Sequence, residues 1–256
     1  MGNVQVSPEG IAGDTTKRQL HVFFLVDNSG SMAGKKIQKV NWAIRDLLPE
    51  MGKLEDDERI RIYMGSIVFG SSAKWHVGPD PVSVEKFSWK DLDGGGGGTS
   101  TAQAIKLLTD ALGIEKMGAR NIPPVCILLS DGYCTDPHPE YEKAIAALNN
   151  QPWGKKAVRL SIGIAQHDND YSKDELDMFI SPYLRKENNL ETLHADTPQK
   201  LLQYIKTTST MAVKAASDSR SDTESTASTT PVQFAQSDIE DKAGAIFGEV
   251  QADESW

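Results

Sequence analysis

The sequence of 256 residues predicts an α/β fold with a doubly wound, mostly parallel central sheet, one antiparallel edge strand and helices on both faces. Three observations predict this fold. Strand-like and helix-like segments alternate along residues 18–216. Several strand-like segments, such as FFLV and VCILL, are almost continuously apolar, which is typical of strands buried on both faces. The segments between them are amphipathic, as expected of helices that cover a sheet.

Apolar runs predict five strands in chain order and a sixth at the edge of the sheet. The five are Gln19–Val26, Arg59–Phe69, Val125–Ser130, Ala157–Ile164 and Leu190–Leu193, and the edge strand lies around Lys74–Gly78. The expected helices are Lys36–Met51, Thr101–Met117, Pro139–Asn149, Lys173–Ser181 and Thr197–Ala216. Pro139 fits a first helical turn, where the N–H that proline lacks would have no partner. In such a fold, ligands bind at the carboxyl ends of the strands.

Composition divides the chain into four parts: an N-terminal lead-in (1–17), the α/β domain (18–216), a linker rich in Ser and Thr (217–232) and an acidic tail (233–256). Between Thr207 and Thr230, 13 of the 24 residues are Ser or Thr, and such a stretch buries too little apolar surface to offset its ordering entropy. The tail nevertheless carries large apolar side chains. It is therefore either a disordered tail or a short motif that folds on a partner.

Charge and composition exclude several classes of function. The net charge of −9 argues against nucleic acid as a partner. No apolar run approaches the roughly 20 residues of a membrane span, and the first residues lack the pattern of a secretory signal. The two cysteines, Cys126 and Cys134, do not make a disulfide framework. A cytoplasmic location is the simplest interpretation.

The stretch VDNSGSM follows the first strand directly and carries Asp27, Ser29 and Ser31 at every second position. In a loop, this spacing can turn three oxygens toward one centre, as alternate residues do in calcium loops. By themselves these residues are ordinary turn formers. A common binding site becomes the better interpretation because Thr99 lies between a run of five glycines and a helix, and Asp131 directly follows the buried strand VCILLS.

Carboxylate and hydroxyl oxygens from three strand ends make an all-oxygen ligand set. Hard oxygen ligands suit Mg²⁺, with Mn²⁺ or Ca²⁺ as alternatives, and do not suit zinc or copper. Asp27, Ser29, Ser31, Thr99 and Asp131 are therefore the candidate metal ligands. Asn28 and Gly30, which alternate with them, are expected to shape the loop.

These three segments together resemble the von Willebrand factor A (VWA) domain and its metal-ion-dependent adhesion site (MIDAS). More narrowly, DNSGSMAGKKIQKVNWAIRDLLPEM and LLSDGYCTDP are similar to bacterial tellurium-resistance-associated (TerY-like) proteins, which are cytoplasmic. The resemblance implies that Ser29, Ser31 and sometimes Thr99 hold the ion directly. It implies that Asp27 and Asp131 act directly or through water. The five glycines depart from the two that the family usually has.

Other chemistries lack their motifs. GGGGGTST has no Lys before the Ser or Thr, so it is not a phosphate-binding loop. The five histidines are scattered, without the spacing of a zinc site. Neither Ser29 nor Ser31 lies in a nucleophile elbow, and no His is placed recognisably as its partner. The protein is therefore not expected to be an enzyme.

The expected function is metal-mediated protein binding, in which a Glu or Asp of a protein partner completes the coordination of Mg²⁺. The resemblance implies a scaffold or regulator beside a PP2C-type phosphatase and a Ser/Thr kinase, in a stress response to tellurite or phage. Two alternatives stay open. One is the metal-domain subunit of a chelatase-type AAA+ ATPase system, and the other is a metal-dependent phosphoester hydrolase.

Overall fold

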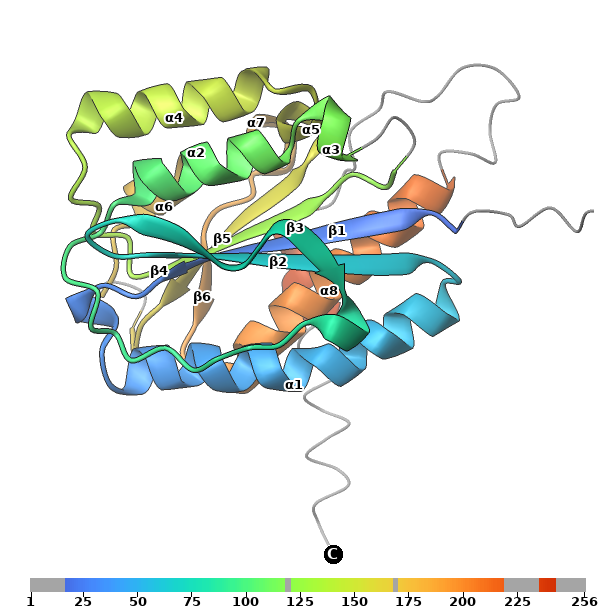
Figure 1. Cartoon of the computed structure of the whole chain (residues 1–256), viewed down its shortest axis with the longest axis horizontal. Coiled ribbons are helices and arrows are strands. Elements are labelled where there is room, and N and C mark those ends of the chain that lie inside the picture. The colour runs from blue at the N-terminus through green and yellow to red at the C-terminus, as the bar shows by residue number, and fades with distance from the viewer. Residues whose placement is uncertain (1–16, 118–120, 168–169, 219–234, 243–256) are drawn as a thin grey trace, which may run out of the picture.

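The computed structural model describes residues 17–117, 121–167, 170–218 and 235–242. Its centre is a sheet of six strands in the order β3-β2-β1-β4-β5-β6 (Figure 1). The strands are β1 (Gln19–Asp27), β2 (Arg61–Phe69), β3 (Ala73–Ser83), β4 (Val125–Ser130), β5 (Val158–Ile164) and β6 (Leu193–Ala195). All neighbours pair in parallel except β3, which is antiparallel to β2. The predicted mostly parallel sheet with one antiparallel edge strand is confirmed.

Helices cover both faces of this sheet. They are α1 (Lys35–Asp57), α2 (Thr101–Ala111), α3 (Ile114–Met117), α4 (His138–Asn150), α5 (Pro152–Lys156), α6 (Lys173–Asp177), α7 (Pro182–Asn188) and α8 (Pro198–Asp218). In Figure 1, α1 and α8 lie below the sheet, and α2 and α4 lie above it. Short 3₁₀ turns cover Gly30–Met32 and Val84–Lys86.

Each face of the sheet has its own hydrophobic core, and β1 contributes to both. Phe24 and Val26 belong to the core shared with α1 and α8, whereas Phe23 and Leu25 belong to the core shared with α2 and α4. Successive side chains of a strand point to opposite faces. A strand covered on both faces must therefore be apolar at every position, which explains the run FFLV.

Several element boundaries differ from the prediction. The first helix continues past Met51 to Asp57, with Pro49 exposed inside it. The predicted helix Thr101–Met117 is broken at Gly113 into α2 and α3, because glycine weakens a helix interior. The last strand begins at Leu193, where the predicted one ends. The short helices α5 and α7 were not predicted, although both begin with a proline.

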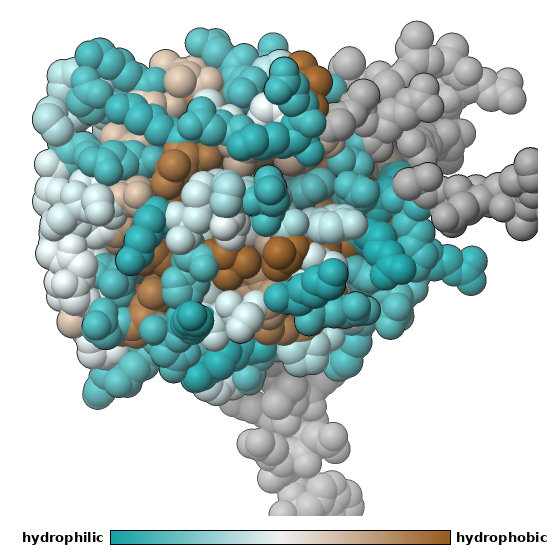
Figure 2. All heavy atoms as spheres, viewed as in Figure 1, coloured by the Kyte–Doolittle hydropathy of each residue, from teal (hydrophilic) through white to brown (hydrophobic). Residues whose placement is uncertain are grey.

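The antiparallel edge strand β3 is longer than predicted and is protected from further pairing. Pro79 and Pro81 lack backbone donors, and the pairing with β2 shifts register near Ser66. Figure 2 shows the molecule from this side: apolar side chains surface in a band between the two helical layers, and the rest of this face is mostly hydrophilic. Trp75 and Val77 of β3 are partly buried against the two cores.

The topology places two predicted site residues next to each other. From β1 the chain passes through α1 to β2 on one side of the sheet, and it later enters β4 on the other side of β1. The strand order therefore reverses between β1 and β4, the position where α/β sheets open a crevice for ligands. Asp27 ends β1 and Asp131 follows β4 at this position.

The predicted lead-in (1–17) and linker (217–232) lie largely outside the described residues, as does most of the predicted tail (233–256). Within the tail, residues 236–242 form a helix. Its Ile239 is completely buried and belongs to the core shared with α1 and α8. The Glu191 N–H also donates a hydrogen bond to Gln236 Oε1 (3.2 Å). This part of the tail packs on its own domain.

One buried side chain of β1 makes folding sensitive to acid. The His21 ring stacks on Tyr63, with centroids 5.5 Å apart, and its Nδ1 is buried without a hydrogen-bond partner. Burial lowers the pKa of His21 from 6.5 to about 4, because a protonated ring would be desolvated there. The unfolded chain therefore takes up this proton at a higher pH than the folded chain does.

We expect the free energy of unfolding to fall as the pH drops from about 6.5 to 4, by about 3 kcal/mol from His21 alone. Because the pKa of His21 is lower in the folded chain than in the unfolded chain, its contribution to stability is complete above pH 6.5 and is lost as the pH falls toward 4. In His21→Phe, which keeps the stacking, that part of the pH dependence should disappear. Urea denaturation of both proteins at several pH values measures it, and equal slopes would contradict the assignment to His21.

Candidate metal site

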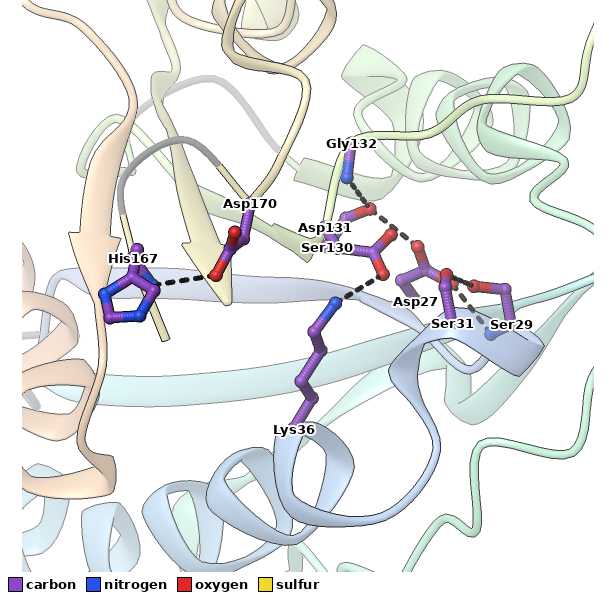
Figure 3. Close-up of polar contacts among 9 residues, drawn as sticks. All are labelled: Asp27, Ser29, Ser31, Lys36, Ser130, Asp131, Gly132, His167 and Asp170. Atoms are coloured by element: carbon purple, nitrogen blue, oxygen red, sulfur yellow. Dashed lines mark hydrogen bonds and ion pairs between the residues drawn. The ribbon is translucent and has the colours of Figure 1, made fainter. Parts of the chain in front are cut away.

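The centre of the site is Asp27, the last residue of β1, whose side chain is completely buried. The Ser29 N–H donates to Asp27 Oδ1 (2.7 Å), and the Ser130 hydroxyl donates to Asp27 Oδ2 (2.6 Å) (Figure 3). Ser130 Oγ in turn accepts the N–H of Gly132 (2.9 Å). This chain of hydrogen bonds fixes the carboxylate with respect to both strand ends.

Among the described residues, Asp27 forms no ion pair with a cationic side chain. Burial raises the pKa of Asp27, and the nearby negative charge of Asp131 acts in the same direction. The hydrogen bonds from Ser130 and Ser29 act in the opposite direction but are weaker than the effect of burial. A buried carboxylate whose ionised form is disfavoured is the group that a bound cation would stabilise.

The second carboxylate, Asp131, follows β4 and is also completely buried. Its Oδ2 lies 3.0 Å from Lys36 Nζ, and its Oδ1 is buried without a hydrogen-bond partner. A buried polar atom without a partner costs about 1–3 kcal/mol, so such atoms are rare in folded proteins. Asp131 Oδ1 is therefore available to bind something that supplies positive charge.

Two hydroxyls lie beside these carboxylates. Ser29 Oγ and Ser31 Oγ are 3.0 Å apart, Ser29 is buried and Ser31 is exposed. Figure 3 shows both on the Asp27 side of the site, with Lys36 reaching toward Asp131 from α1. The site thus has buried carboxylates at its base and reaches solvent at Ser31.

The glycine run holds the loop of Ser29 and Ser31 in place. Asn28 Oδ1 accepts the Gly94 N–H (2.7 Å), and the Asn28 carbonyl accepts the Gly96 N–H (2.8 Å). The Gly30 N–H donates to the Gly97 carbonyl (3.0 Å). Asn28, through its side chain and its backbone, and Gly30, through its backbone, therefore hold the loop against the backbone of the glycines.

Close packing explains why glycines stand in this run. A Cβ on Gly96 would lie 2.7 Å from the Asn28 carbonyl oxygen. Gly94 has a φ of +75°, and a Cβ there would lie 2.4 Å from Ala33 Cα. A side chain at either position would push the two loops apart.

Thr99 follows the glycines and is buried. Its N–H donates to Thr135 Oγ1 (2.8 Å), and its carbonyl accepts the Thr135 N–H (3.0 Å). These bonds tie the glycine loop to the segment after Asp131. In the described part of the chain, no hydrogen bond joins the Thr99 hydroxyl to the other four predicted ligands.

The segment that follows β5 contacts the backbone of the site. The Ser172 N–H donates to the Asp131 carbonyl (3.1 Å). In the same loop, the His167 N–H donates to Asp170 Oδ2 (3.1 Å), as Figure 3 shows. Ser172, in the segment after β5, thus supports the backbone of Asp131.

The structure brings Asp27, Ser29, Ser31 and Asp131 together and adds two residues that sequence reasoning missed, Ser130 and Lys36. Ser130 had a weak signal, because it is the last residue of a strand that runs beside β1. Nothing in the sequence indicates that the Lys36 side chain turns toward Asp131.

The residues present fit a hard divalent cation. They offer carboxylate and hydroxyl oxygens, the donors that Mg²⁺, Mn²⁺ and Ca²⁺ prefer, and Asp131 Oδ1 has no other partner. Among the described residues, no cluster of three or more His, Cys, Asp or Glu side chains forms a metal site. Hydroxyl groups would therefore have to supply part of the coordination.

Sequence comparison assigns the family. The profile of the von Willebrand factor type A domain matches residues 21–182, more than half of the chain. The chain belongs to the von Willebrand factor type A domain family. A search of curated proteins found no match.

Solved structures agree with this VWA fold. The PilB minor pilin of Streptococcus sanguinis has a TM-score of 0.55 at 11% identity, over 78% of this chain and 62% of the pilin. Proximal thread matrix protein 1 of the mussel byssus, with zinc in its MIDAS motif, has a TM-score of 0.51 at 16% identity, over 77% of this chain and 46% of that protein. A von Willebrand factor type A protein of Catenulispora acidiphila has a TM-score of 0.50 at 14% identity, over 77% and 43%.

This chain thus spans about half of the length of two of these proteins and under two thirds of the third. Within the described part of the VWA chain, no helix is both long enough and apolar enough to span a bilayer.

We expect Gly96→Ala to lower the free energy of unfolding of this VWA domain by about 1–3 kcal/mol, because the new methyl group would collide with the Asn28 carbonyl. Gly95→Ala is the matched control: its methyl group would meet only the exposed Asp93 side chain, at 3.2 Å. Denaturant unfolding measures both. Equal stability of the two variants would contradict the tight contact between the loops.

Proposed function

We propose that this VWA domain binds a divalent cation, Mg²⁺ or its analogues Mn²⁺ and Ca²⁺, through Asp27, Ser29, Ser31, Thr99 and Asp131. We propose further that the bound ion attaches an acidic group of a partner protein. The observation that carries this proposal is the pair of buried carboxylates at the ends of β1 and β4, one of which has an oxygen without a partner among the described residues. The zinc-occupied MIDAS motif of the mussel byssus protein gives it further support.

The chain's own residues would leave the ion able to take one more ligand, and hard divalent cations prefer carboxylate oxygens. Asp27 and Asp131 carry at most two negative charges, and the serine and threonine hydroxyls are neutral. A divalent cation balances these two charges, and when bound it supplies an open coordination position to an oxygen ligand. Ser31 places that position at the surface, because it is the exposed member of the set.

An exposed aromatic side chain stands next to the site. Tyr133 follows Asp131 by two residues, and 52% of its surface is exposed. Exposed tyrosines beside a polar centre are frequent anchors of protein interfaces, because they bury a large area at low entropic cost. Tyr133 therefore supports a protein surface, and not a small free acid, as the ligand.

The system in which the domain acts is a further part of the proposal. The TerY-like segments support a scaffold or regulator of a PP2C-type phosphatase and a Ser/Thr kinase, in a cytoplasmic stress response to tellurite or phage. We propose no catalytic activity. Lys36, which lies at the site, is paired with Asp131 and is not placed to clamp a phosphate.

Calorimetric titration of the full chain with Mg²⁺ and Mn²⁺ tests the metal site. We expect one ion per chain, and an affinity at least about tenfold lower in Ser31→Ala because one oxygen ligand is lost. Ser88→Ala, another change at an exposed serine, should bind like the wild type. No ion binding by the folded wild type would contradict the proposal.

A pull-down with purified candidate kinase and phosphatase tests partner binding. Wild-type protein with Mg²⁺ should retain a partner, and both EDTA and Asp27→Ala should release it, because each removes the proposed ion. Circular dichroism of Asp27→Ala establishes that the variant is folded. If folded Asp27→Ala captured the same partner in EDTA, a metal-mediated contact would be wrong.

A further inference from the structure

The candidate metal site contains a positive charge supplied by the chain. Lys36 lies in the first turn of α1, and its Nζ is 3.0 Å from Asp131 Oδ2. Asp131 is completely buried, whereas 28% of the Lys36 side chain is exposed. The ammonium group therefore reaches from the surface onto a buried carboxylate that is one of the proposed metal ligands (Figure 3).

Charge counting shows what this lysine contributes to the site. Asp27 and Asp131 together carry two negative charges when ionised, and Lys36 balances one of them. The lysine pairs with Asp131 and not with Asp27, whose described partners are the Ser29 N–H and the Ser130 hydroxyl. Without an ion, the site keeps a net charge of −1. With a divalent cation, the same three side chains give a net charge of +1.

We propose that Lys36 competes with the metal ion for Asp131 and so determines both the ion affinity and the charge of the group that the site accepts. In the ion-free protein, Lys36 neutralises Asp131. When an ion binds, the ammonium leaves Asp131 Oδ2 but stays at the rim, where it adds attraction for an acidic partner. This inference rests on the proposed function, because it requires the ion site.

The side chain is suited to this exchange. Lysine carries a point charge on a flexible stem of four carbons, so the ammonium can swing toward solvent without movement of α1. The ion would bind Asp131 Oδ1 while Lys36 Nζ lies on Oδ2 of the same carboxylate, so the two cations would repel each other, strongly where solvent is partly excluded. Ion binding must therefore work against the contact between Lys36 and Asp131, and this lowers the affinity for the ion.

The chain offers a matched control in the preceding residue. Lys35 is exposed, occupies the same first turn of α1 and forms no ion pair with a described residue. Replacing Lys35 or Lys36 by Met removes one charge at the same end of the same helix. Only the Lys36 change removes a charge that contacts a proposed ligand.

Calorimetric titration of the full-length wild type, Lys36→Met and Lys35→Met with Mg²⁺ and Mn²⁺ tests the inference. We expect Lys36→Met to bind the ion about tenfold more tightly, because no ammonium has to be displaced, and Lys35→Met to stay within about twofold of the wild type. In EDTA, Lys36→Met should unfold at a lower denaturant concentration than Lys35→Met, because Asp131 loses its counter-charge. Lys36→Gln, which keeps a polar group, serves as the second variant.

The outcomes separate this inference from the proposed function. Equal affinities in wild type, Lys36→Met and Lys36→Gln, or weaker binding by the Lys36 variants, would overturn the competition while leaving the ion site intact. No binding by any folded protein would overturn the proposed function and the inference with it. Ion binding by the Lys36 variants alone would support the inference and would contradict ion binding by the wild type.

Discussion

Two carboxylates buried side by side, Asp27 and Asp131, are the constraint on which the rest of this site depends. Like charges in a poorly solvated place repel each other, and the charge of Asp131 adds to the burial that raises the pKa of Asp27. The described contacts stabilise the two carboxylates: the Ser29 N–H and the Ser130 hydroxyl donate to Asp27, and the Lys36 ammonium pairs with Asp131. One oxygen, Asp131 Oδ1, is left without compensation. A bound cation is the simplest group that would neutralise the remaining negative charge and give Asp131 Oδ1 a partner.

The fold makes this arrangement possible at a small structural cost. Asp27 ends β1 and Asp131 directly follows the neighbouring parallel strand β4, so the sheet sets their separation, and β1 and β4 pack into the cores on both faces. The remaining donors come from loops, which could diverge without support. The glycine run prevents this because its backbone packs directly against Asn28. The charged carboxylates thus lie at the ends of paired strands, and the neutral hydroxyl groups of Ser29 and Ser31 lie in a loop that hydrogen bonds to the glycine run hold in place.

The sequence predicts the parts of this structure that depend on local pattern. Continuous apolar runs located β1 and β4, and polar residues directly after them located Asp27 and Asp131, since a strand's carboxyl end can be recognised from its own residues. Features that depend on register or side-chain direction were not predictable. Ser130 meets Asp27 only because Val26 pairs with Leu129 across the sheet. Likewise, helix periodicity places Lys36 near the site but does not tell which way its long side chain turns.

The charge balance also indicates which acidic group fits best. Asp27, Asp131, Lys36 and a divalent cation sum to +1, so one carboxylate brings the site to neutrality. A phosphate monoester carries about −1.5 to −2 at neutral pH and would leave excess negative charge against two buried aspartates. Desolvated sites penalise such an excess strongly. If the proposed ion binds, the side chain of Glu or Asp would therefore match this site better than a phosphorylated residue. Lys36 would be responsible for this preference, because without its charge the ion-loaded site would already be neutral.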